Sequence, residues 1–191
     1  MYNFFAYLNR MKFIERWSLM HSIYKENIME HSLNVSILAH ALAVIENEVY
    51  DGKVDEYKTL AYAVYHEVSE VITGDLPTPI KYFNAKINTA YKELESYANE
   101  KLIDSLPEKL QNRYKQFIFA DFESEEYKLC KAADKLAAYI KCIEELSSGN
   151  LEFKKAKETT EKDIKNFKIN SVKYFMENFI KGYELSLDEL E

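Results

Sequence analysis

Glycine and proline are scarce in this chain, which has only 4 glycines and 3 prolines among its 191 residues. A fold of many short strands needs more turn-forming residues, so this composition argues against an all-β protein. Basic residues are also outnumbered: 25 lysines and arginines face 32 acidic residues, for a formal net charge of −7. A general nucleic-acid surface needs a basic face and is therefore disfavoured, whereas a small anionic ligand held by one or two cations is not.

Cysteines and long apolar runs are equally rare. Cys130 and Cys142 are the two cysteines, and in one helix they would lie about 18 Å apart, beyond disulfide reach. We expect both to be reduced core residues, as in a cytoplasmic protein. The longest largely apolar run, Ile37 to Ile45, falls well short of the roughly 20 residues of a membrane span, and residues 1–12 lack a signal-peptide pattern. These features predict a soluble protein with no membrane partner.

Helical periodicity dominates the rest of the chain. It predicts helical segments at Asn27 to Val49, Asp55 to Ile72, Ile80 to Ser105, Glu108 to Ala120, Glu123 to Ser147 and Leu151 to Tyr183. The first has a predicted buried stripe of Leu33, Ile37, Leu38, Ala41, Leu42 and Ile45. Thr73 to Pro79 holds two of the three prolines and is predicted to be a rigid, extended loop. The pattern predicts a single all-α domain over residues 1–191.

Several charged groups interrupt the apolar stripes. The second predicted helix carries one heptad-spaced stripe at Leu60, Val64, Glu67 and Val71. A buried carboxylate such as Glu67 is costly unless it is paired or binds a metal. His66 lies beside it, and Glu70 follows His66 at i+4, which predicts that both lie on one helix face.

Two further segments repeat this feature. His31 lies in the first turn of an otherwise apolar helix, and Asp134 lies among alanines. Together with His66 and Glu67, they form a donor set that suits a borderline divalent cation such as Mn²⁺, Co²⁺, Fe²⁺ or Zn²⁺. Alternatively, His31 caps a helix, His66 is a satisfied core histidine and both acids pair with lysines. Spacing along the chain does not decide between the two readings.

The motifs resemble those of a known family. The order of His31, His66–Glu67 and Asp134 in an alanine-rich helix resembles the HD-domain metal-dependent phosphohydrolases. A closer similarity, to the bacterial 5'-deoxynucleotidases, extends from Phe4 to Glu189 and rests on Arg16–Met20, Glu26–Ser32, Tyr65–Glu70, Thr73–Asn84, Lys131–Asp134, Tyr174–Glu177 and Leu185–Leu190. The resemblance implies an HD-domain helical bundle that acts as a homodimeric hydrolase. Its expected reaction is hydrolysis of deoxyribonucleoside 5'-monophosphates with one divalent metal ion, such as Co²⁺ or Mn²⁺.

The resemblance also implies roles for individual residues. The metal ligands would be His31, His66, Glu67 and Asp134, and all of these except His66 would also line the substrate site. Arg16 would orient the phosphate through its planar guanidinium, and Trp17 would pack by the sugar and select deoxyribose. The wall around the nucleotide would comprise Asp75, Leu76, Pro77 and Thr78. Glu70 would orient or deprotonate the attacking water, while Asp75 would contact the sugar hydroxyl or protonate the leaving 5'-oxygen.

One position departs from the family pattern, because the defining dipeptide His-Asp is His66–Glu67 here. The extra methylene moves the carboxylate by roughly 1.5 Å, a large distance beside the tolerance of a metal–ligand bond. We expect metal chemistry to be retained, since glutamate supplies the same charge and the same ligand atom. The alternatives are a nucleotide-binding protein with weakened or lost catalysis, a deoxynucleoside triphosphate hydrolase and a purely structural helical dimer.

Overall fold

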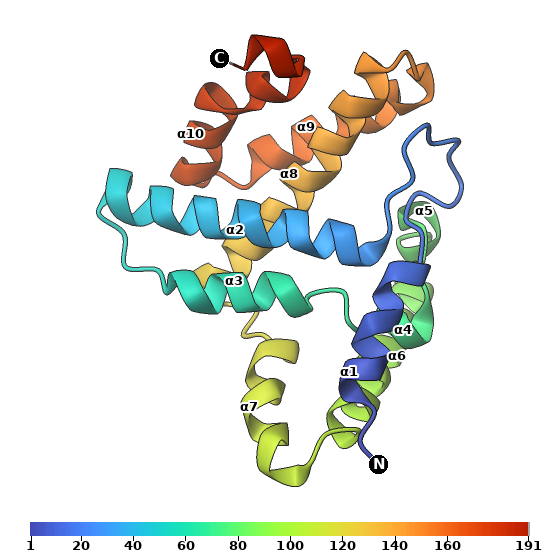
Figure 1. Cartoon of the computed structure of the whole chain (residues 1–191). Coiled ribbons are helices and arrows are strands. Elements are labelled where there is room, and N and C mark those ends of the chain that lie inside the picture. The colour runs from blue at the N-terminus through green and yellow to red at the C-terminus, as the bar shows by residue number, and fades with distance from the viewer. Residues whose placement is uncertain (191) are drawn as a thin grey trace. The chain divides into compact units, whose positions relative to one another are not determined.

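The computed structural model describes residues 1–190, and its regular elements are helices (Figure 1). In chain order, with η for 3-10 helices, they are α1 (Phe4–Leu8), η1 (Asn9–Phe13), α2 (Ile28–Tyr50), α3 (Glu56–Tyr65), α4 (Glu70–Thr73), α5 (Thr78–Lys81), α6 (Ala85–Asp104), α7 (Glu108–Ile118), α8 (Glu125–Ser147), η2 (Leu151–Phe153), α9 (Lys154–Asn166), α10 (Asn170–Asn178), η3 (Ile180–Glu184) and η4 (Leu187–Glu189). Within residues 1–190 the extended backbone pairing is one isolated antiparallel bridge, between Glu15 and Asn27. The all-α prediction is confirmed.

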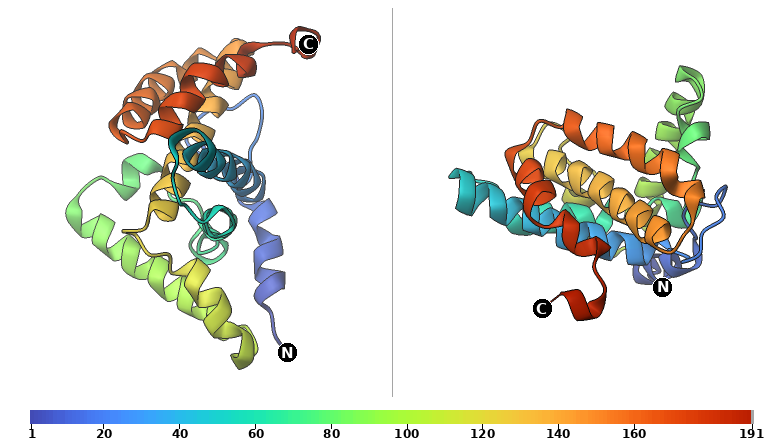
Figure 2. Two further views of the ribbon diagram at one scale, coloured as in Figure 1. Left: turned by 90° about the vertical axis from the view of Figure 1, so that its left-hand side faces the viewer. Right: turned by 90° about the horizontal axis from the view of Figure 1, so that it is seen from above.

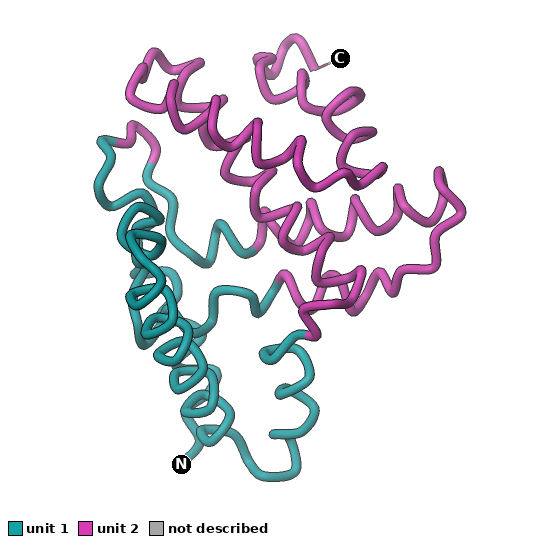
Figure 3. The backbone as a smooth tube through the Cα atoms, turned by 180° about the vertical axis from the view of Figure 1, so that it is seen from behind, with its two compact units in different colours: residues 1–21, 25–32, 64–120 teal, residues 22–24, 33–63, 121–191 magenta. Residues whose placement is uncertain are grey.

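The chain forms two compact units, which Figure 3 shows in different colours. The first unit comprises residues 1–21, 25–32 and 64–120, and the second comprises residues 22–24, 33–63 and 121–190. Both are therefore built from segments that are distant in sequence. A single domain over residues 1–191 stays a prediction.

The first unit is organised around α6, which packs against α1, α4, α5 and α7 (Figure 1). Its core cluster consists of Phe4, Met11, Ile28, Val68, Leu102, Ile103, Leu106 and Ile118. Burying one such side chain contributes roughly 1.5–3 kcal/mol, so this cluster is the main stabilising feature of the unit. Helix α6 begins where the Asn84 side chain accepts a hydrogen bond from the backbone N–H of Ile87 at 2.9 Å.

The second unit is organised around α8, which packs against α9, η2 and η3 (Figure 2). Cys130 and Cys142 lie on the buried side of α8, as predicted, and neither forms a disulfide. The residue 33–50 part of α2 is joined to α10, because the Ser171 N–H donates to Glu46 Oε2 at 3.3 Å. The rings of Tyr50 and Tyr174 also meet edge to face, with centroids 6.4 Å apart.

Helix α2 is long and apolar enough to cross a membrane by length and composition alone. The core helix of a soluble protein passes the same test, and 56% of the apolar window of α2 is buried within the structure. The predicted stripe is confirmed at Leu38, Leu42 and Ile45, which are buried, but wrong at Leu33 and Ile37, which are 61% and 60% exposed. Helix α2 is therefore weak evidence for a membrane span.

The predicted helix from Asp55 to Ile72 is wrong, because it is broken at residues 66–69 between α3 and α4. Val68, Ser69 and Glu70 are all buried, and three consecutive inward residues do not fit the 3.6-residue period of a helix. The predicted stripe fails with it, since Val64 is 41% exposed. His66 and Glu70 therefore do not share one helix face.

The proline-rich segment also differs from its prediction. Thr78 and Pro79 belong to α5 and not to the loop, because proline is tolerated in a first helical turn, where its missing N–H has no partner. The predicted helix from Ile80 to Ser105 is consequently divided into α5 and α6.

The C-terminal segment from Leu151 to Tyr183 is not one helix. It divides into η2, α9, α10 and η3, with a break at Lys168, whose φ of 52° is left-handed and cannot continue an α-helix. Within α10, Phe175 is buried and the Tyr174 ring packs against Phe179.

A buried carboxylate in the second unit holds the segment 22–24. Glu145 is 0% exposed and accepts hydrogen bonds from the backbone N–H groups of Ile23 and Tyr24, at 2.9 and 3.0 Å. Lys141 Nζ and Asn150 Nδ2 donate to the same carboxylate at 2.6 and 2.7 Å. Burial alone raises the pKa of Glu145, but these hydrogen bonds outweigh burial and lower the pKa to about 2.

This arrangement predicts a pH-dependent contribution to stability. Because the pKa of folded Glu145 lies below its ordinary 4.5, the carboxylate stabilises the fold above that pH and loses this effect as the pH falls towards about 2. Glu145→Gln should lower the free energy of unfolding by about 3 kcal/mol at neutral pH, since it breaks a buried ion pair. Urea unfolding of both proteins between about pH 7 and pH 3 should show this difference shrinking with acidification.

The matched control is Glu158→Gln, which removes a charge from an exposed carboxylate 3.8 Å from Lys155. It should change the unfolding free energy by about 0.5 kcal/mol or less. If Glu145→Gln lowers the free energy of unfolding by the same amount at every pH, the ionised carboxylate does not have the stabilising role proposed for it.

Candidate functional site

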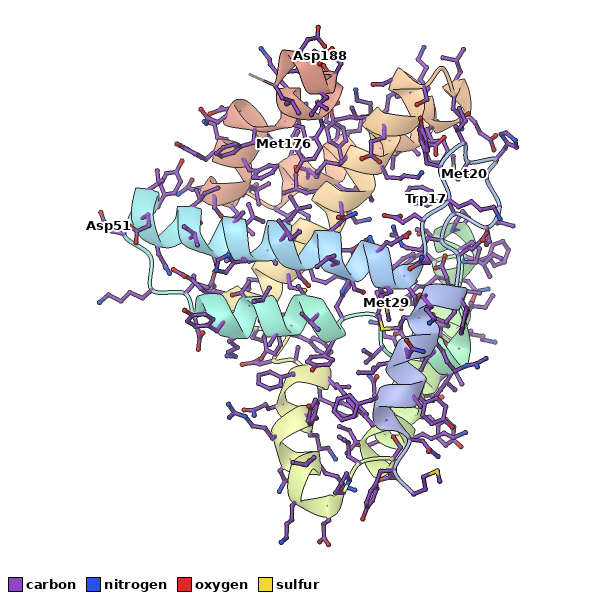
Figure 4. The ribbon with its side chains drawn as sticks, in the orientation of Figure 1. Trp17, Met20, Met29, Asp51, Met176 and Asp188 are labelled. Atoms are coloured by element: carbon purple, nitrogen blue, oxygen red, sulfur yellow. The ribbon has the colours of Figure 1, made fainter. Side chains whose placement is uncertain are left out.

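The segment 14–28 is closed at its base by backbone pairing. The Arg16 N–H donates to the Glu26 carbonyl at 2.9 Å, and the Ile28 N–H donates to the Ile14 carbonyl at 3.0 Å. Trp17 and Met20 lie on the loop that this pairing closes (Figure 4). The pairing therefore holds Arg16 directly opposite Glu26.

Arg16, Trp17 and Glu26 form one polar group. Arg16 Nη1 donates to Glu26 Oε2 at 2.5 Å, and Trp17 Nε1 donates to the same oxygen at 3.3 Å. The Arg16 guanidinium carbon lies 5.7 Å from the centre of the Trp17 ring. The predicted phosphate and sugar residues are thus brought together, with a carboxylate behind them.

The backbone of Trp17 is left-handed, with φ of 60°. This conformation costs a bulky residue roughly 1–2 kcal/mol, and such strain is concentrated at functional sites. The Met20 N–H donates to the Trp17 carbonyl at 2.8 Å and closes a tight turn that holds it.

His31 lies in the first turn of α2 because the helix start is capped just before it. Asn27 Oδ1 accepts from the N–H groups of Met29 and Glu30, both at 3.0 Å, and Glu30 Oε2 accepts from the Asn27 N–H at 3.2 Å. The side chain of His31 is 0% exposed, and its Nδ1 lies 3.9 Å from Glu26 Oε1.

His31, His66 and Glu67 converge in the first unit. The centroids of the two imidazole rings are 5.3 Å apart, and His66 Nε2 lies 3.4 Å from Glu67 Oε1. One ligand atom of each residue lies within 4.8 Å of those of the other two. Glutamate at 67, despite its extra methylene, therefore keeps its carboxylate beside both histidines.

Asp134, the fourth predicted metal ligand, belongs to the second unit. It lies on α8, where Ala132, Ala133 and Leu136 around it are buried. Its Oδ2 accepts from Lys131 Nζ at 3.3 Å. Asp134 therefore pairs with a lysine, as the alternative interpretation of the sequence predicts.

The side chain of Glu70 is buried and only 6% exposed. Burial, and then the neighbouring carboxylate of Glu67, raise the pKa of Glu70 to about 11, with Asp75 adding to the effect and Arg16 opposing it. A carboxyl of this kind readily holds a proton, and a cation bound beside it would lower its pKa.

The loop from Gly74 to Pro77 brings Asp75 to the same group. Burial raises the pKa of Asp75, the guanidinium of Arg16 opposes this, and Glu67 adds to it. Gly74 has φ of 73°, a conformation that glycine adopts without strain.

The rest of the predicted wall is less enclosed. Asp75, Leu76 and Pro77 are half-buried, whereas Thr78 is exposed.

Lys81 follows the wall residues on α5. Its Nζ binds Glu95 Oε1 at 2.7 Å and lies 4.5 Å from the centre of the Tyr91 ring.

Glu26 was not among the predicted site residues, although its carboxylate contacts Arg16 and Trp17 and approaches His31. The local signal was weak, because Glu26 precedes the helix and interrupts no apolar stripe. The contacts of Glu26 depend on the antiparallel bridge between Glu15 and Asn27, which helical periodicity does not predict.

The fold defined by these elements is that of the HD-domain phosphohydrolases. An HD-domain phosphohydrolase from Listeria innocua superposes with a TM-score of 0.83 at 23% identity, covering 95% of this chain and 88% of that one. A cyanophage S-2L HD phosphohydrolase, DatZ, solved with dA and one catalytic Zn²⁺ ion, superposes with a TM-score of 0.66 at 16% identity over 93% of this chain and 96% of that one.

The chain belongs to the YfbR-like 5'-deoxynucleotidase family, whose model matches residues 3–183. It is 48% identical over 189 residues to a 5'-deoxynucleotidase of Pectobacterium atrosepticum, covering 98% of this chain and 95% of that protein. It is also 48% identical to a 5'-deoxynucleotidase of Erwinia tasmaniensis, with 98% and 96% coverage. The family predicted from the motifs is confirmed.

Proposed function

We propose that this protein hydrolyses deoxyribonucleoside 5'-monophosphates to a deoxyribonucleoside and phosphate. The observation that carries the proposal is the approach of His31, His66 and Glu67 within 4.8 Å in a chain of this family. Its relatives are 5'-deoxynucleotidases, which supports the same substrate class here.

The donor set fits one divalent cation of borderline character. The imidazoles of His31 and His66 and the carboxylate of Glu67 would hold it, with Co²⁺ and Mn²⁺ as candidates. The family resemblance adds Asp134 as the fourth ligand. The zinc of the cyanophage neighbour supports a divalent ion in this fold. When bound, such an ion lowers the pKa of water and stabilises negative charge on phosphoryl oxygens.

The protein's own groups bind and orient the nucleotide. Arg16 offers planar N–H donors that match two phosphate oxygens, and Glu26 holds one edge of its guanidinium. Trp17 packs by the sugar and leaves no room for a 2'-hydroxyl. Asp75, Leu76, Pro77 and Thr78 line the wall around the nucleotide.

Proton transfer falls to the two further carboxyl groups. Glu70 is buried beside Glu67, and its ionised carboxylate orients the attacking water and takes its proton. Asp75 contacts the sugar hydroxyl or delivers a proton to the leaving 5'-oxygen.

The decisive experiment is phosphate release from dAMP, TMP and AMP by protein stripped with EDTA and then supplied with Mn²⁺, Co²⁺, Mg²⁺ or Zn²⁺. We expect metal-dependent release from the deoxynucleotides and little from AMP. Including dATP tests the triphosphatase alternative, and preferential attack on dATP would overturn the proposal.

A second candidate function follows from Glu67 standing where the family pattern has aspartate. In this alternative, the protein binds nucleotides without turnover. We expect Glu67→Asp to change turnover of dAMP by less than about tenfold and Glu67→Gln to lower it by at least about 100-fold, because only the latter removes the charge. If Glu67→Asp instead creates activity absent from the native protein, the binding function is correct.

We also propose that the protein is a cytoplasmic homodimer that binds neither nucleic acid nor a membrane. The buried cysteines Cys130 and Cys142, which form no disulfide, support a reducing compartment. The exposed side chains of Leu33 and Ile37 support an apolar interface. Light scattering of the purified protein measures the mass that tests the dimer.

A further inference from the structure

Glu26 takes no direct part in the chemistry proposed above, but its carboxylate contacts Arg16 and Trp17, which bind the nucleotide there. Its side chain is 10% exposed. The backbone pairing of Arg16 with Glu26 fixes its position independently of any ligand. The fold of the loop therefore places the Glu26 carboxylate beside Arg16 even when no nucleotide is bound.

The two oxygens of Glu26 face different groups. Oε2 accepts from Arg16 Nη1 at 2.5 Å and from Trp17 Nε1 at 3.3 Å, while Oε1 lies 3.9 Å from His31 Nδ1. Because a guanidinium has five N–H donors, the one that binds Glu26 leaves others for a phosphate. The indole has a single N–H donor, so its bond to Glu26 fixes the direction of the ring.

Trp17 is held in a conformation that its backbone does not favour, with φ of 60°. A strained residue keeps its place only when the surrounding contacts over-determine it. The Glu26 carboxylate supplies one such contact from the side-chain end, and the turn to Met20 supplies one from the backbone.

We infer that Glu26 is a positioning residue that sets selectivity for deoxyribose by fixing the Trp17 indole while it orients Arg16 towards the phosphate. This inference rests on the proposed function, in which Trp17 is the sugar filter. Loss of the carboxylate frees the ring and admits a 2'-hydroxyl.

The test compares Glu26→Ala with Glu26→Gln. The alanine variant removes both contacts and should lower the ratio of kcat/KM for dAMP to that for AMP by about 10-fold or more, as expected for a lost hydrogen bond to a charged group. The glutamine variant keeps an oxygen acceptor for the indole and loses the charge facing Arg16. It should raise KM for both nucleotides and largely keep the ratio.

A second readout needs neither metal nor turnover. Trp17 is the only tryptophan in the chain, so its fluorescence reports on this position alone. In metal-free protein, Glu26→Ala should lower the fluorescence anisotropy and increase quenching by acrylamide, and Glu26→Gln should restore much of both.

The matched control is Glu15→Ala. Glu15 lies on the same antiparallel bridge, but its exposed carboxylate binds Lys25 at 2.9 Å. This variant should leave selectivity and fluorescence unchanged.

Two results would overturn the inference. One is an unchanged ratio and unchanged anisotropy in Glu26→Ala, and the other is an equal loss on dAMP and AMP with only a lower melting temperature. If native protein does not prefer dAMP, the proposed function fails, while the fluorescence still tests whether Glu26 holds Trp17.

Discussion

Replacing His66 with alanine should lower turnover of dAMP by about 10² to 10³-fold in the presence of Mn²⁺ or Co²⁺. The reason is that His66, with Nε2 3.4 Å from Glu67, supplies one of the donors that would hold the cation. Losing the cation removes several kcal/mol of transition-state stabilisation. Calorimetric titration with Co²⁺ should show binding weakened in parallel with activity.

The control is His40→Ala, since His40 is half exposed, lies 3.9 Å from Glu56 and is outside the candidate ligand group. It should keep native activity and metal affinity. Thermal melting of the metal-free proteins separates a lost ligand from a lost fold, and His66→Asn offers a second variant of smaller volume change. Turnover by folded His66→Ala within about threefold of native protein would contradict the metal site.

Replacing Glu70 with glutamine should lower kcat by about 10² to 10⁴-fold, the usual contribution of a positioned acid or base. The amide keeps the size of the buried side chain, which is 6% exposed in the native protein, but cannot accept a proton from water. Phosphate release measured across pH should show the largest loss where native activity is maximal, and KM should change little.

Glu100→Gln provides the comparison, because Glu100 is an exposed carboxylate 3.2 Å from Lys115 on the same unit. It should leave kcat unchanged. Metal titration of Glu70→Gln is needed as well, and retained affinity with lost turnover is the expected pattern. Native kcat in Glu70→Gln would remove Glu70 from the mechanism.

The start of α2 was predicted within one residue, and its signal is local, because Asn27 and Glu30 cap the helix through neighbouring backbone groups. The start of α6 at Asn84 was missed, because the predicted helix ran through it from Ile80. The interruption at residues 66–69 was not predictable from periodicity. It depends on Val68 and Glu70 both being buried within the first unit, a tertiary preference that overrides the helical pattern.

The candidate site divides in the same way. Its candidate donors were identified from the sequence, since His31 and His66 match known motifs and Glu67 stands where the motif has aspartate. Glu26 was not identified from the sequence. Its carboxylate contacts Arg16 and Trp17 because an antiparallel bridge pairs segments about ten residues apart.

The sequence by itself determined the all-α class, the family and the identity of the candidate donors, because composition, periodicity and motif order are properties of the chain alone. Only the tertiary structure decided that His31, His66 and Glu67 approach within 4.8 Å, and that glutamate at 67 still reaches the two imidazoles. That approach brings together residues 35 positions apart, and packing, which no local pattern encodes, fixes the distance between them.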